Sequence, residues 1–375
     1  MPPGVYVVAR LLPVFTASAA ALVVLAAVAA LTMTGAALAA LAQDDIKRVL
    51  AYSTISQLGL MTGALAVADR GAAVFHLLTH GAFKALLFLA AGVLIHTAGT
   101  GSLAAMSRLR GLKRSAPDAF WTMTIALLAL AAVPPFAGFF SKEAVLAAAE
   151  HTAVEPAAGI PAAAGWLVLV AGLLTALITA AYAARLWLVV FHDPVDARTE
   201  PVPAHEASSP VMTAVLWVLA VPSLTLGLAF GPLPGRLDGG SMDPQLVTSV
   251  LATGAALAGG ILAYAAWRRA YESDLPADPG PALLGRLHPH AAAGFHLDTA
   301  LAAAVVRPTE AAARLVRFLD RAVVETYVRG AGAAPGLLGA AVRRAQTGNV
   351  QTYLSTLLAG ALVLAAAAVL VAAGG

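Results

Sequence analysis

Residues 75–94 read FHLLTHGAFKALLFLAAGVL, an apolar run with two histidines and one lysine in it. A run of about 18 or more apolar residues can cross the roughly 30 Å hydrocarbon layer of a bilayer as a helix. Lipid leaves no partner for a free backbone polar group, so such a run must be helical. This stretch therefore predicts a membrane-spanning helix. We expect the rest of the chain to belong to the same class, that of helical membrane proteins.

The composition of the 375-residue chain agrees, because 60% of the residues are hydrophobic and 11% are charged. The mean hydropathy of +0.82 exceeds what a soluble domain needs for one core. The alternation of apolar and polar residues that is typical of membrane-barrel strands is absent from the sequence. We expect an all-α polytopic bundle with a discontinuous helix and a lateral amphipathic helix on the cytoplasmic surface.

Charge and motifs argue against several classes of function. The net charge is only +3 and the basic residues lie mainly in loops, which argues against nucleic-acid binding. The absence of cysteine excludes disulfides and cysteine-ligated iron–sulfur clusters. The glycines of residues 330–336 match a dinucleotide fingerprint only weakly, and there is no Walker loop. We expect no NADH, flavin, ATP or metal site in this chain.

Apolar runs predict about eight spanning helices. They cover residues 14–42, 46–67, 72–97, 118–150, 162–191, 209–231, 246–267 and 351–373. Loops on one side hold most basic residues, namely Lys47, Arg48, Arg108, Arg110, Lys113, Arg114, Arg198, Arg268, Arg269 and Arg286. The other side has only Arg10, Arg70 and Arg236. The positive-inside rule therefore predicts that the side with more basic residues faces the cytoplasm. The C-terminus, Gly374-Gly375, then faces the periplasm of a bacterial inner membrane.

The segment from 268 onward differs from the spanning runs. Residues 268–296 predict a Pro- and Gly-rich loop, and residues 297–345 an amphipathic helix interrupted at Pro308 and Gly330–Gly332. Its apolar stripe is Ala312, Leu315, Val316, Leu319, Ala322 and Val323, and its charged face is Glu310, Arg314, Arg317, Arg321, Glu325 and Arg329. It either lies on the membrane surface or packs on its own bundle as a solvated helix.

His76, His80 and Lys84 are four residues apart and so share one helix face. Lys84 lies too deep to reach an interface, and a charge at that depth costs about 2.5–3.5 kcal/mol, so it should be paired, hydrated or functional. Buried amines and imidazoles can exchange protons near neutral pH, which is what a proton relay needs. The alternative is a structural polar cluster that holds helices together.

The fourth span reads AAVPPFAGFFSKEAVL at its centre, residues 131–146. Pro134 and Pro135 remove two backbone donors, and we expect Gly138 to loosen the chain further, so the helix should break here. Such breaks mark ion sites in transporters. Lys142 and Glu143 follow at the start of the second half-helix, and we expect Lys142 to release its proton readily, with Glu143 as a partner. The alternative is a proline kink followed by an interfacial ion pair.

Several further polar residues are secondary candidates. Ser53 and Gln57 share a face of the second span and could hold water or simply pack helices. Asp45 and Lys47 belong to a charged cluster at the membrane boundary that we interpret as a structural anchor. Arg185, near the end of the fifth span, could pair with this cluster or extend to the interface.

At these residues the sequence resembles the antiporter-like subunits of respiratory complex I. The similar stretches are AQDDIKRVLAYSTISQLGLM (42–61), FHLLTHGAFKALLFLAAG (75–92) and PPFAGFFSKEAVL (134–146). The tail, AQTGNVQTYLSTLLAGALVL (345–364), resembles the end of subunit L of bacterial NADH-quinone oxidoreductase.

The resemblance implies a role for each motif residue. Lys84 matches the connecting lysine of the family, and His76 and His80 its flanking histidines. Lys142 matches the terminal lysine of the second channel, while Glu143 stands where subunit L commonly has aspartate.

The resemblance also implies an organisation. Residues 14–192 would form the second antiporter-like repeat. The remaining segments would be the remnant of a preceding helix at 1–13, additional spans over 209–267, the loop at 268–296, the lateral helix at 297–345 and an anchoring span at 351–373. The first repeat of the family has no counterpart here. We expect a truncated gene product, a wrongly assigned start or one part of a split subunit.

The implied function is proton translocation as a subunit of complex I, driven by quinone reduction in other subunits. Those subunits would hold NADH, FMN, the iron–sulfur clusters and quinone, and the lateral helix would contact neighbouring membrane subunits. Two alternatives stay open. One is the large subunit of a multi-subunit Na+/H+ antiporter, and the other is a non-pumping structural anchor.

Overall fold

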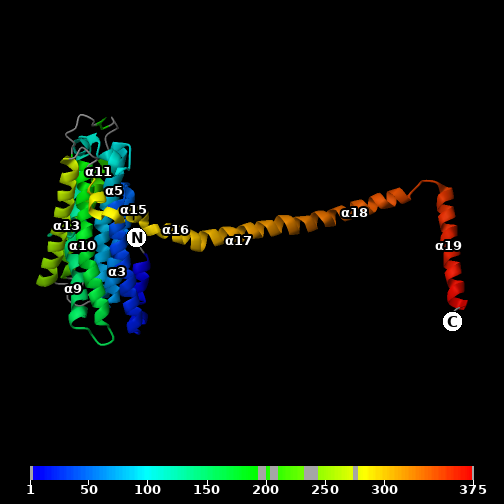
Figure 1. Ribbon diagram of the computed structural model, residues 1–375, viewed down its shortest axis with the longest axis horizontal. Helices are drawn as coiled ribbons and strands as arrows, with labels where there is room; N and C mark the ends of the chain where they lie inside the picture. Colours follow the sequence, from blue (N-terminus) through cyan, green and yellow to red (C-terminus); the bar gives the residue numbers. More distant parts are fainter. Residues whose placement is uncertain (1–2, 193–199, 203–209, 232–243, 273–277, 374–375) are drawn as a thin grey trace. The chain divides into compact units, whose positions relative to one another are not determined.

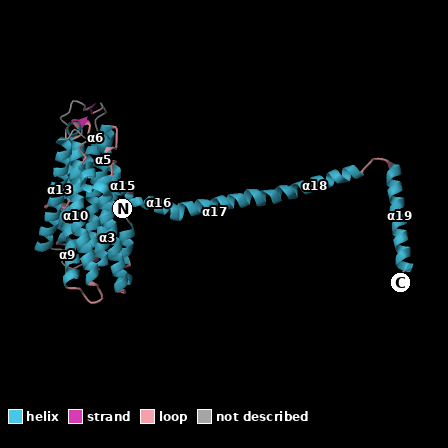
Figure 2. Cartoon of the chain, in the orientation of Figure 1, coloured by secondary structure: helices cyan, strands magenta, loops and turns pink. Residues whose placement is uncertain are grey.

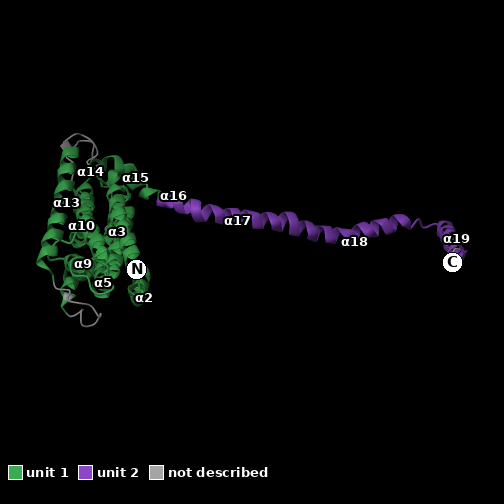
Figure 3. Cartoon of the chain, turned by 60° about the horizontal axis from the view of Figure 1, so that its bottom comes forward, with its two compact units in different colours: residues 1–296 green, residues 297–375 purple. Residues whose placement is uncertain are grey.

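The computed structural model describes residues 3–192, 200–202, 210–231, 244–272 and 278–373. They form two compact units, divided after His296 (Figure 3). Both units are built of helices, and the described chain has one pair of two-residue strands, β1 (Leu109–Arg110) and β2 (Glu200–Pro201), in parallel (Figure 2). The all-α class is therefore confirmed. Several residues used in the sequence predictions lie outside the described ranges, namely Arg198, Arg236, Gly374, Gly375 and residues 273–277.

Seven described helices are long and apolar enough to cross a membrane. They are α3 (Ala19–Ala42), α4 (Ile46–Ala66), α5 (Arg70–Ala98), α10 (Ala162–Phe191), α11 (Pro210–Thr225) with the 3₁₀ turn η1 (Leu226–Phe230), α13 (Leu246–Glu272) and α19 (Val350–Ala373). The eighth expected span is two shorter helices, α8 (Pro117–Leu130) and α9 (Ala137–Val154). The first span starts five residues later than expected, after the short helices α1 (Pro3–Arg10) and α2 (Leu12–Thr16).

Side-chain caps set where the first three spans begin. Ser18 Oγ accepts from Ala21 N–H at 3.4 Å, and Asp45 Oδ1 accepts from Arg48 N–H at 3.0 Å. Asp69 Oδ1 accepts from Ala72 N–H at 2.7 Å, and α5 ends at Gly99, whose φ of 70° suits glycine. These caps pair donors that a helix start leaves free, so the chain can turn at the interface between spans.

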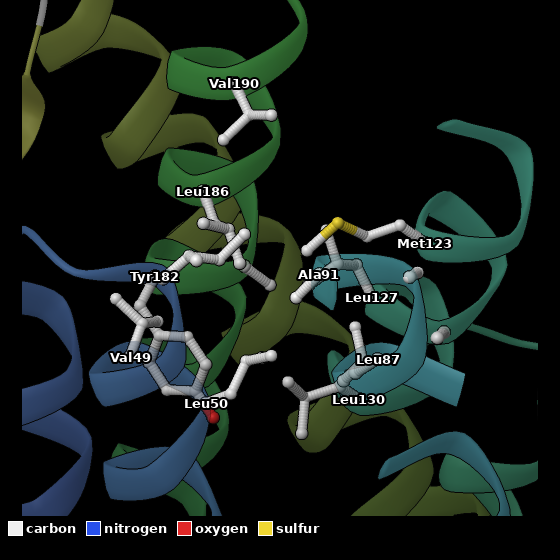
Figure 4. Close-up of a cluster of buried hydrophobic side chains, with 14 of the residues drawn as sticks. Val49, Leu50, Leu87, Ala91, Met123, Leu127, Leu130, Tyr182, Leu186 and Val190 are labelled. Atoms are coloured by element: carbon white, nitrogen blue, oxygen red, sulfur yellow. The ribbon is translucent and has the colours of Figure 1, made fainter. Parts of the chain in front are cut away.

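The core of the first unit lies between helices that run side by side in the bundle (Figure 1). α10 packs against α3, α9 and α13, while α5 packs between α4 and α8. Figure 4 shows the apolar centre of this packing, with Leu50 of α4, Leu87 of α5, Leu130 of α8 and Tyr182 of α10 directed into one cluster. This core fixes the face of α5 on which the polar residues lie, and a second apolar cluster that includes Ala144 and Val145 holds α9.

The two half-helices α8 and α9 are joined by residues 131–136. Pro134 and Pro135 lie in this linker, and neither has a backbone N–H with which to continue the helical ladder. Gly138 does not loosen the linker as expected, because it lies inside α9. A Cβ there would come within 1.8 Å of the Ala129 carbonyl oxygen, so glycine allows the two half-helices to approach closely.

The segment expected as a loop is mostly helical in its described part. α13 continues to Glu272, and residues 279–296 form α14 (Pro279–Leu284), the turn η2 (Gly285–Leu287), α15 (His288–Ala292) and the turn η3 (Gly294–His296). Gln43 Nε2 donates to the Ala292 carbonyl at 3.1 Å and so holds α15 on the end of α3. The short helices α6 (Leu103–Met106) and α7 (Leu112–Ser115) lie between α5 and α8 along the chain.

The second unit is a long helical segment followed by α19. It comprises α16 (Leu297–Leu301), the π-helical turn η4 (Ala302–Val306), α17 (Arg307–Phe318), the π-helical turn η5 (Leu319–Val324) and α18 (Glu325–Ala345). At Pro308 the α-helical pattern is interrupted as expected, because the π-helical turn η4 ends at Val306 and α17 begins at Arg307. The interruption expected at Gly330–Gly332 is wrong, since α18 continues through these residues. Arg314–Glu310 (3.7 Å) and Arg329–Glu325 ion pairs line its charged face.

Candidate functional site

α5 holds a row of basic side chains inside the bundle. His76, His80 and Lys84 are 0%, 2% and 4% exposed, as their common face on the helix predicts. Lys84 is the middle residue of α5 and lies about 21 Å from each end at 1.5 Å per residue. A lysine at this depth cannot extend its amine to an interface, so the protein itself must accommodate it.

The Lys84 amine contacts α4 and its own helix. Nζ donates a hydrogen bond to Ser53 Oγ, and it lies 6.0 Å from the centroid of the Phe88 ring. Ser53 in turn donates to the Leu50 carbonyl at 2.9 Å. A neutral hydroxyl and an aromatic face stabilise an ammonium less than a carboxylate does, so these contacts compensate only part of the cost of burying the charge.

His76 connects three helices. Its Nε2 lies 3.1 Å from Gln57 Oε1 of α4, and its Nδ1 lies 2.9 Å from Ser141 Oγ of α9. Thr79 Oγ1 donates to Ser141 Oγ at 2.7 Å. Because Gln57 Oε1 can only accept, the neutral ring donates from Nε2 and accepts at Nδ1 from Ser141. The hydroxyls of Thr79 and Ser141 can thus form a chain of hydrogen bonds that ends on the imidazole. The same hydroxyls can also donate to backbone carbonyls, Thr79 to Phe75 and His76 at 3.2 Å and Ser141 to Ala137 at 3.4 Å.

His80 lies between His76 and Lys84 along α5. Its ring centroid is 6.0 Å from that of His76 and 5.4 Å from that of Phe83. Both ring nitrogens are buried, and neither has a hydrogen-bond partner among the described residues. Buried polar atoms are almost always paired, so the two nitrogens of His80 are available to bind water or a transferred proton.

Lys142 reaches across the break in the fourth span. It lies in the second turn of α9, is 4% exposed, and donates from Nζ to the Leu130 carbonyl at 2.6 Å. Leu130 is the last residue of α8, where carbonyls have no partner within the helix and the helix dipole is negative. The C-terminal end of the first half-helix therefore receives the amine of the second.

Glu143 points to a different helix. Its Oε1 accepts from the Gln245 N–H at 2.7 Å and from Thr248 Oγ1 at 2.6 Å, at the N-terminus of α13. Neighbouring residues on a helix are rotated by about 100°, so Lys142 and Glu143 face different partners. In place of the expected pairing with Lys142, the carboxylate of Glu143 holds the start of α13 against α9.

The secondary candidates separate into distinct positions. Ser53 accepts a hydrogen bond from Lys84, and Gln57 bonds the ring of His76. Asp45 caps α4, Lys47 is exposed at the surface, and Arg185 is buried near the end of α10. Asp45 and Lys47 therefore do not touch the row in this structure.

Arg185 forms an ion pair that the sequence did not indicate. Its Nε and Nη2 donate to Asp278 at 2.6 and 2.7 Å, and its Nη1 donates to the Gln43 carbonyl at 2.8 Å. Burial alone would raise the pKa of Asp278, but the hydrogen bond and charge of Arg185 and the Gly280 N–H hold it below its usual value. This pair joins α3, α10 and the segment before α14.

Besides Asp278, the site residues that the sequence did not indicate carry hydroxyls. Ser141 and Thr79 complete the contacts of His76, and Thr248 binds Glu143. Ser141 directly precedes Lys142, and Thr79 directly precedes His80, which is the signal that could have indicated them. We refer to His76, His80, Lys84 and Lys142 as the buried basic row.

Comparison with known proteins places this arrangement in a family. A sequence profile described as "NADH:quinone oxidoreductase/Mrp antiporter, TM" matches residues 3–183. NADH-quinone oxidoreductase subunit L of Mycobacterium tuberculosis (strain ATCC 25618 / H37Rv) is 34% identical over 98% of this chain and 58% of its own length. NAD(P)H-quinone oxidoreductase chain 5 of Picosynechococcus sp. is 35% identical over 64% of this chain and 38% of its own length.

A solved structure shares the fold. A chain of the Mrp complex from Dietzia sp. DQ12-45-1b matches with a TM-score of 0.50 and 22% identity, over 91% of this chain and 33% of that chain. The chain spans less than three-fifths of the length of each relative named here. With its apolar helices and these matches, it is a multi-pass membrane protein that belongs to the antiporter-like family shared by NADH:quinone oxidoreductases and Mrp antiporters.

Proposed function

We propose that this chain translocates protons as a membrane subunit of an NADH:quinone oxidoreductase, the translocase known as complex I. The observation that supports this most is the buried basic row, four titratable side chains inside the bundle that form no hydrogen bond to a carboxylate among the described residues. A row that served only to hold helices together would be expected to have paired polar atoms, and His80 has none paired.

The row suggests a sequence of proton transfers. The Lys84 ammonium gives a proton to one nitrogen of His80, and the other nitrogen releases a proton through an intervening water to His76, whose ring centroid is 6.0 Å away. His76 exchanges protons through Nδ1 with the hydroxyl of Ser141, the residue before Lys142. A second positive charge in this low-dielectric region raises the electrostatic energy of the first, so protonation at one end of the row favours release at the other.

Electron transfer is assigned to other subunits. We infer that NADH, FMN, the iron–sulfur clusters and quinone bind elsewhere in the complex, and that this chain has no redox centre or metal of its own. Its partners are then other membrane subunits, contacted through the second unit, together with lipid and protons. In a bacterial cell membrane we place the basic loops and the long helix of the second unit on the cytoplasmic side and the C-terminus on the periplasmic side.

The test replaces Lys84 by alanine in the assembled complex in inverted membrane vesicles. NADH oxidation, acidification of the vesicle lumen and complex content on native gels are measured together. We expect pumping per NADH to fall by about tenfold or more, as is usual for loss of a proton-transfer group, with the complex still assembled. Lys113→Ala, in the short helix α7, is the matched control. Unchanged pumping with intact assembly would leave the structural-anchor alternative.

The same vesicles distinguish the proposed proton pump from the alternative, a subunit of a Na+/H+ antiporter. Replacing sodium by choline in the buffer leaves proton pumping unchanged if the chain works as a proton pump. Pumping that stops without sodium and returns when sodium is added would favour the Na+/H+ antiporter subunit.

A further inference from the structure

An apolar groove runs beside the break in the fourth span. It has a volume of about 510 Å³ and lies between α8, α10, α13 and the linker that contains Ala132 and Pro134. This groove is separate from the buried basic row, since none of the four basic side chains lines it.

The groove has the length of one membrane leaflet. Its wall on α13 extends from Thr253 to Tyr264, which is about 16 Å along the helix axis at 1.5 Å per residue. The hydrocarbon layer of a bilayer is about 30 Å thick, so each leaflet contributes about half of that. One end of the groove lies at the mid-membrane linker, and the other lies toward the end of α13 and α10.

The walls offer almost no polar partner to an occupant. Trp187 Nε1 donates to Thr124 Oγ1 at 3.0 Å, and Thr124 Oγ1 donates to the Phe120 carbonyl at 2.7 Å, so the donors of two polar lining residues are satisfied within the protein. Leu257 and Ile261 on α13 are 59% and 64% exposed. The surface is therefore suited to a flexible hydrocarbon chain that enters from the surrounding lipid.

The end of the groove near Tyr264 is aromatic and basic. The face of α13 that lines the groove continues to Trp267 and Arg268, with Arg269 next to them. Tyr264 and Trp267 have ring centroids 5.9 Å apart, and Trp267 also contacts the ring of His192 at 4.4 Å. Aromatic rings of this kind gather at the level of lipid headgroups, and arginine there attracts anionic ones.

We propose that the groove binds one acyl chain of an anionic phospholipid, with its phosphate toward Arg268 and Arg269 and its methyl end against Ala132–Pro134. The bound chain packs on the outside of the linker that follows Leu130, whose carbonyl receives Lys142. The lipid is thus a structural ligand of the helix break. This binding does not depend on whether the chain pumps protons.

Two glycines of α13 allow a matched test. Gly260 lines the groove and a Cβ there would meet no atom within 4 Å, so the side chain of Gly260→Leu starts in open space and occupies part of the groove. Gly254 is also open but lies outside the lining, so Gly254→Leu makes the same change of residue away from the groove. Leu257→Trp gives a second way of filling the groove, from an exposed side chain.

The experiment uses the full chain in its assembled complex, reconstituted in vesicles with a phosphatidylglycerol that has a photoreactive group near the acyl methyl end. Cross-linked peptides are identified by mass spectrometry. We expect labelling of the linker and of α13, a fall of at least severalfold in Gly260→Leu and Leu257→Trp, and native labelling in Gly254→Leu. Labelling that Gly260→Leu and Leu257→Trp leave unchanged overturns the proposal, as does a neighbouring protein chain cross-linked in the groove.

The charge preference is tested with the same probe on phosphatidylcholine. We expect weaker labelling by this zwitterionic lipid in the native chain, and similar labelling by the two lipids after Arg268→Gln and Arg269→Gln are combined. Equal labelling of the native chain by both lipids contradicts the proposed anionic headgroup.

Discussion

At the scale of single residues, the neighbouring side chains of Lys142 and Glu143 contact different helices. Lys142 bonds the last carbonyl of α8 at 2.6 Å, whereas Glu143 bonds Gln245 and Thr248 at the start of α13. One side chain thus contacts the helix break and the other holds a separate helix in place. This division makes Lys142 the better site at which to separate proton transfer from assembly.

We predict that Lys142→Met lowers proton pumping much more than it lowers the amount of assembled complex. The variant removes the titratable amine and leaves the Leu130 carbonyl without its partner, a loss of about 1–3 kcal/mol that a multi-helix bundle tolerates. Pumping per NADH oxidised should fall about tenfold or more, as for other proton-transfer groups. A complex that fails to assemble, or one that pumps normally, would argue against a role for Lys142 in the transfer.

The Arg185–Asp278 pair gives a prediction on stability. Asp278→Asn leaves the buried Arg185 without its counter-charge and should lower the free energy of unfolding by about 3 kcal/mol, the lower end for a buried pair. The low end applies because the Asp278 side chain is 27% exposed. Thermal unfolding of the purified protein measures this, and the exposed Asp298→Asn is the control. A difference as small as that of the control would contradict the prediction.

The same pair has a defined pH dependence. The pKa of Asp278 is lower in the folded chain than its ordinary value, so the carboxylate stabilises the fold fully above that ordinary value. This contribution is lost as the pH falls through the lowered folded pKa. The stability difference between native chain and Asp278→Asn should therefore be constant from pH 5 to 8, above the ordinary value of about 3.9, and shrink below about pH 4.

How far the site can be predicted from sequence depends on whether contacts are local. The common face of His76, His80 and Lys84 follows from a spacing of four residues, so the sequence contains it. The partners of Glu143 and Arg185, Thr248 and Asp278, are 105 and 93 residues away along the chain. Their pairing depends on which helices become neighbours, and residue spacing gives no information on that.

At the scale of elements, the break between α8 and α9 shows what proline and glycine each contribute. Pro134 and Pro135 predict the interruption because they remove backbone donors, and residues 131–136 are indeed non-helical between the two half-helices. The function of Gly138 was not predictable, because it depends on the Ala129 carbonyl of the other half-helix. A close approach between elements leaves no local pattern in the sequence.

A substitution of Gly138 therefore tests whether the two half-helices must approach closely at the break. We predict that Gly138→Ala destabilises the protein by about 1–3 kcal/mol, the usual cost of overpacking, although alanine favours a helix. The reason is the 1.8 Å distance that the new Cβ would have to the Ala129 carbonyl oxygen. Thermal unfolding is compared with Gly92→Ala in α5, where a Cβ meets no atom within 4 Å. A Gly138→Ala variant as stable as Gly92→Ala would show that the half-helices can move apart freely.

At the scale of the whole molecule, the chain consists of a bundle with its own core and a second unit without one. The described residues of the second unit, 297–373, include none that are buried. Its apolar stripe was predictable from the helical spacing of Leu315, Val316 and Leu319. The continuity of its helix through Gly330–Gly332 was not, because glycine lowers helix stability only by about 1 kcal/mol and neighbouring turns outweigh that.

An apolar stripe that its own unit does not cover must be covered by lipid, by the first unit or by another protein. We predict that Leu315→Asp combined with Leu319→Asp, which places two charges on the stripe, lowers the amount of this chain retained in the purified complex at least severalfold. The first unit should still insert in the membrane, because six of the seven apolar spans lie in it and its core includes no residue of 297–373. Arg314→Gln combined with Arg321→Gln, on the charged face of the same helix, is the matched control.

Membrane fractionation and quantitative mass spectrometry of the complex measure insertion and retention separately. Normal retention of the stripe variant would show that this face needs no apolar partner, and equal loss in the control would show that helix content, not the stripe, determines retention.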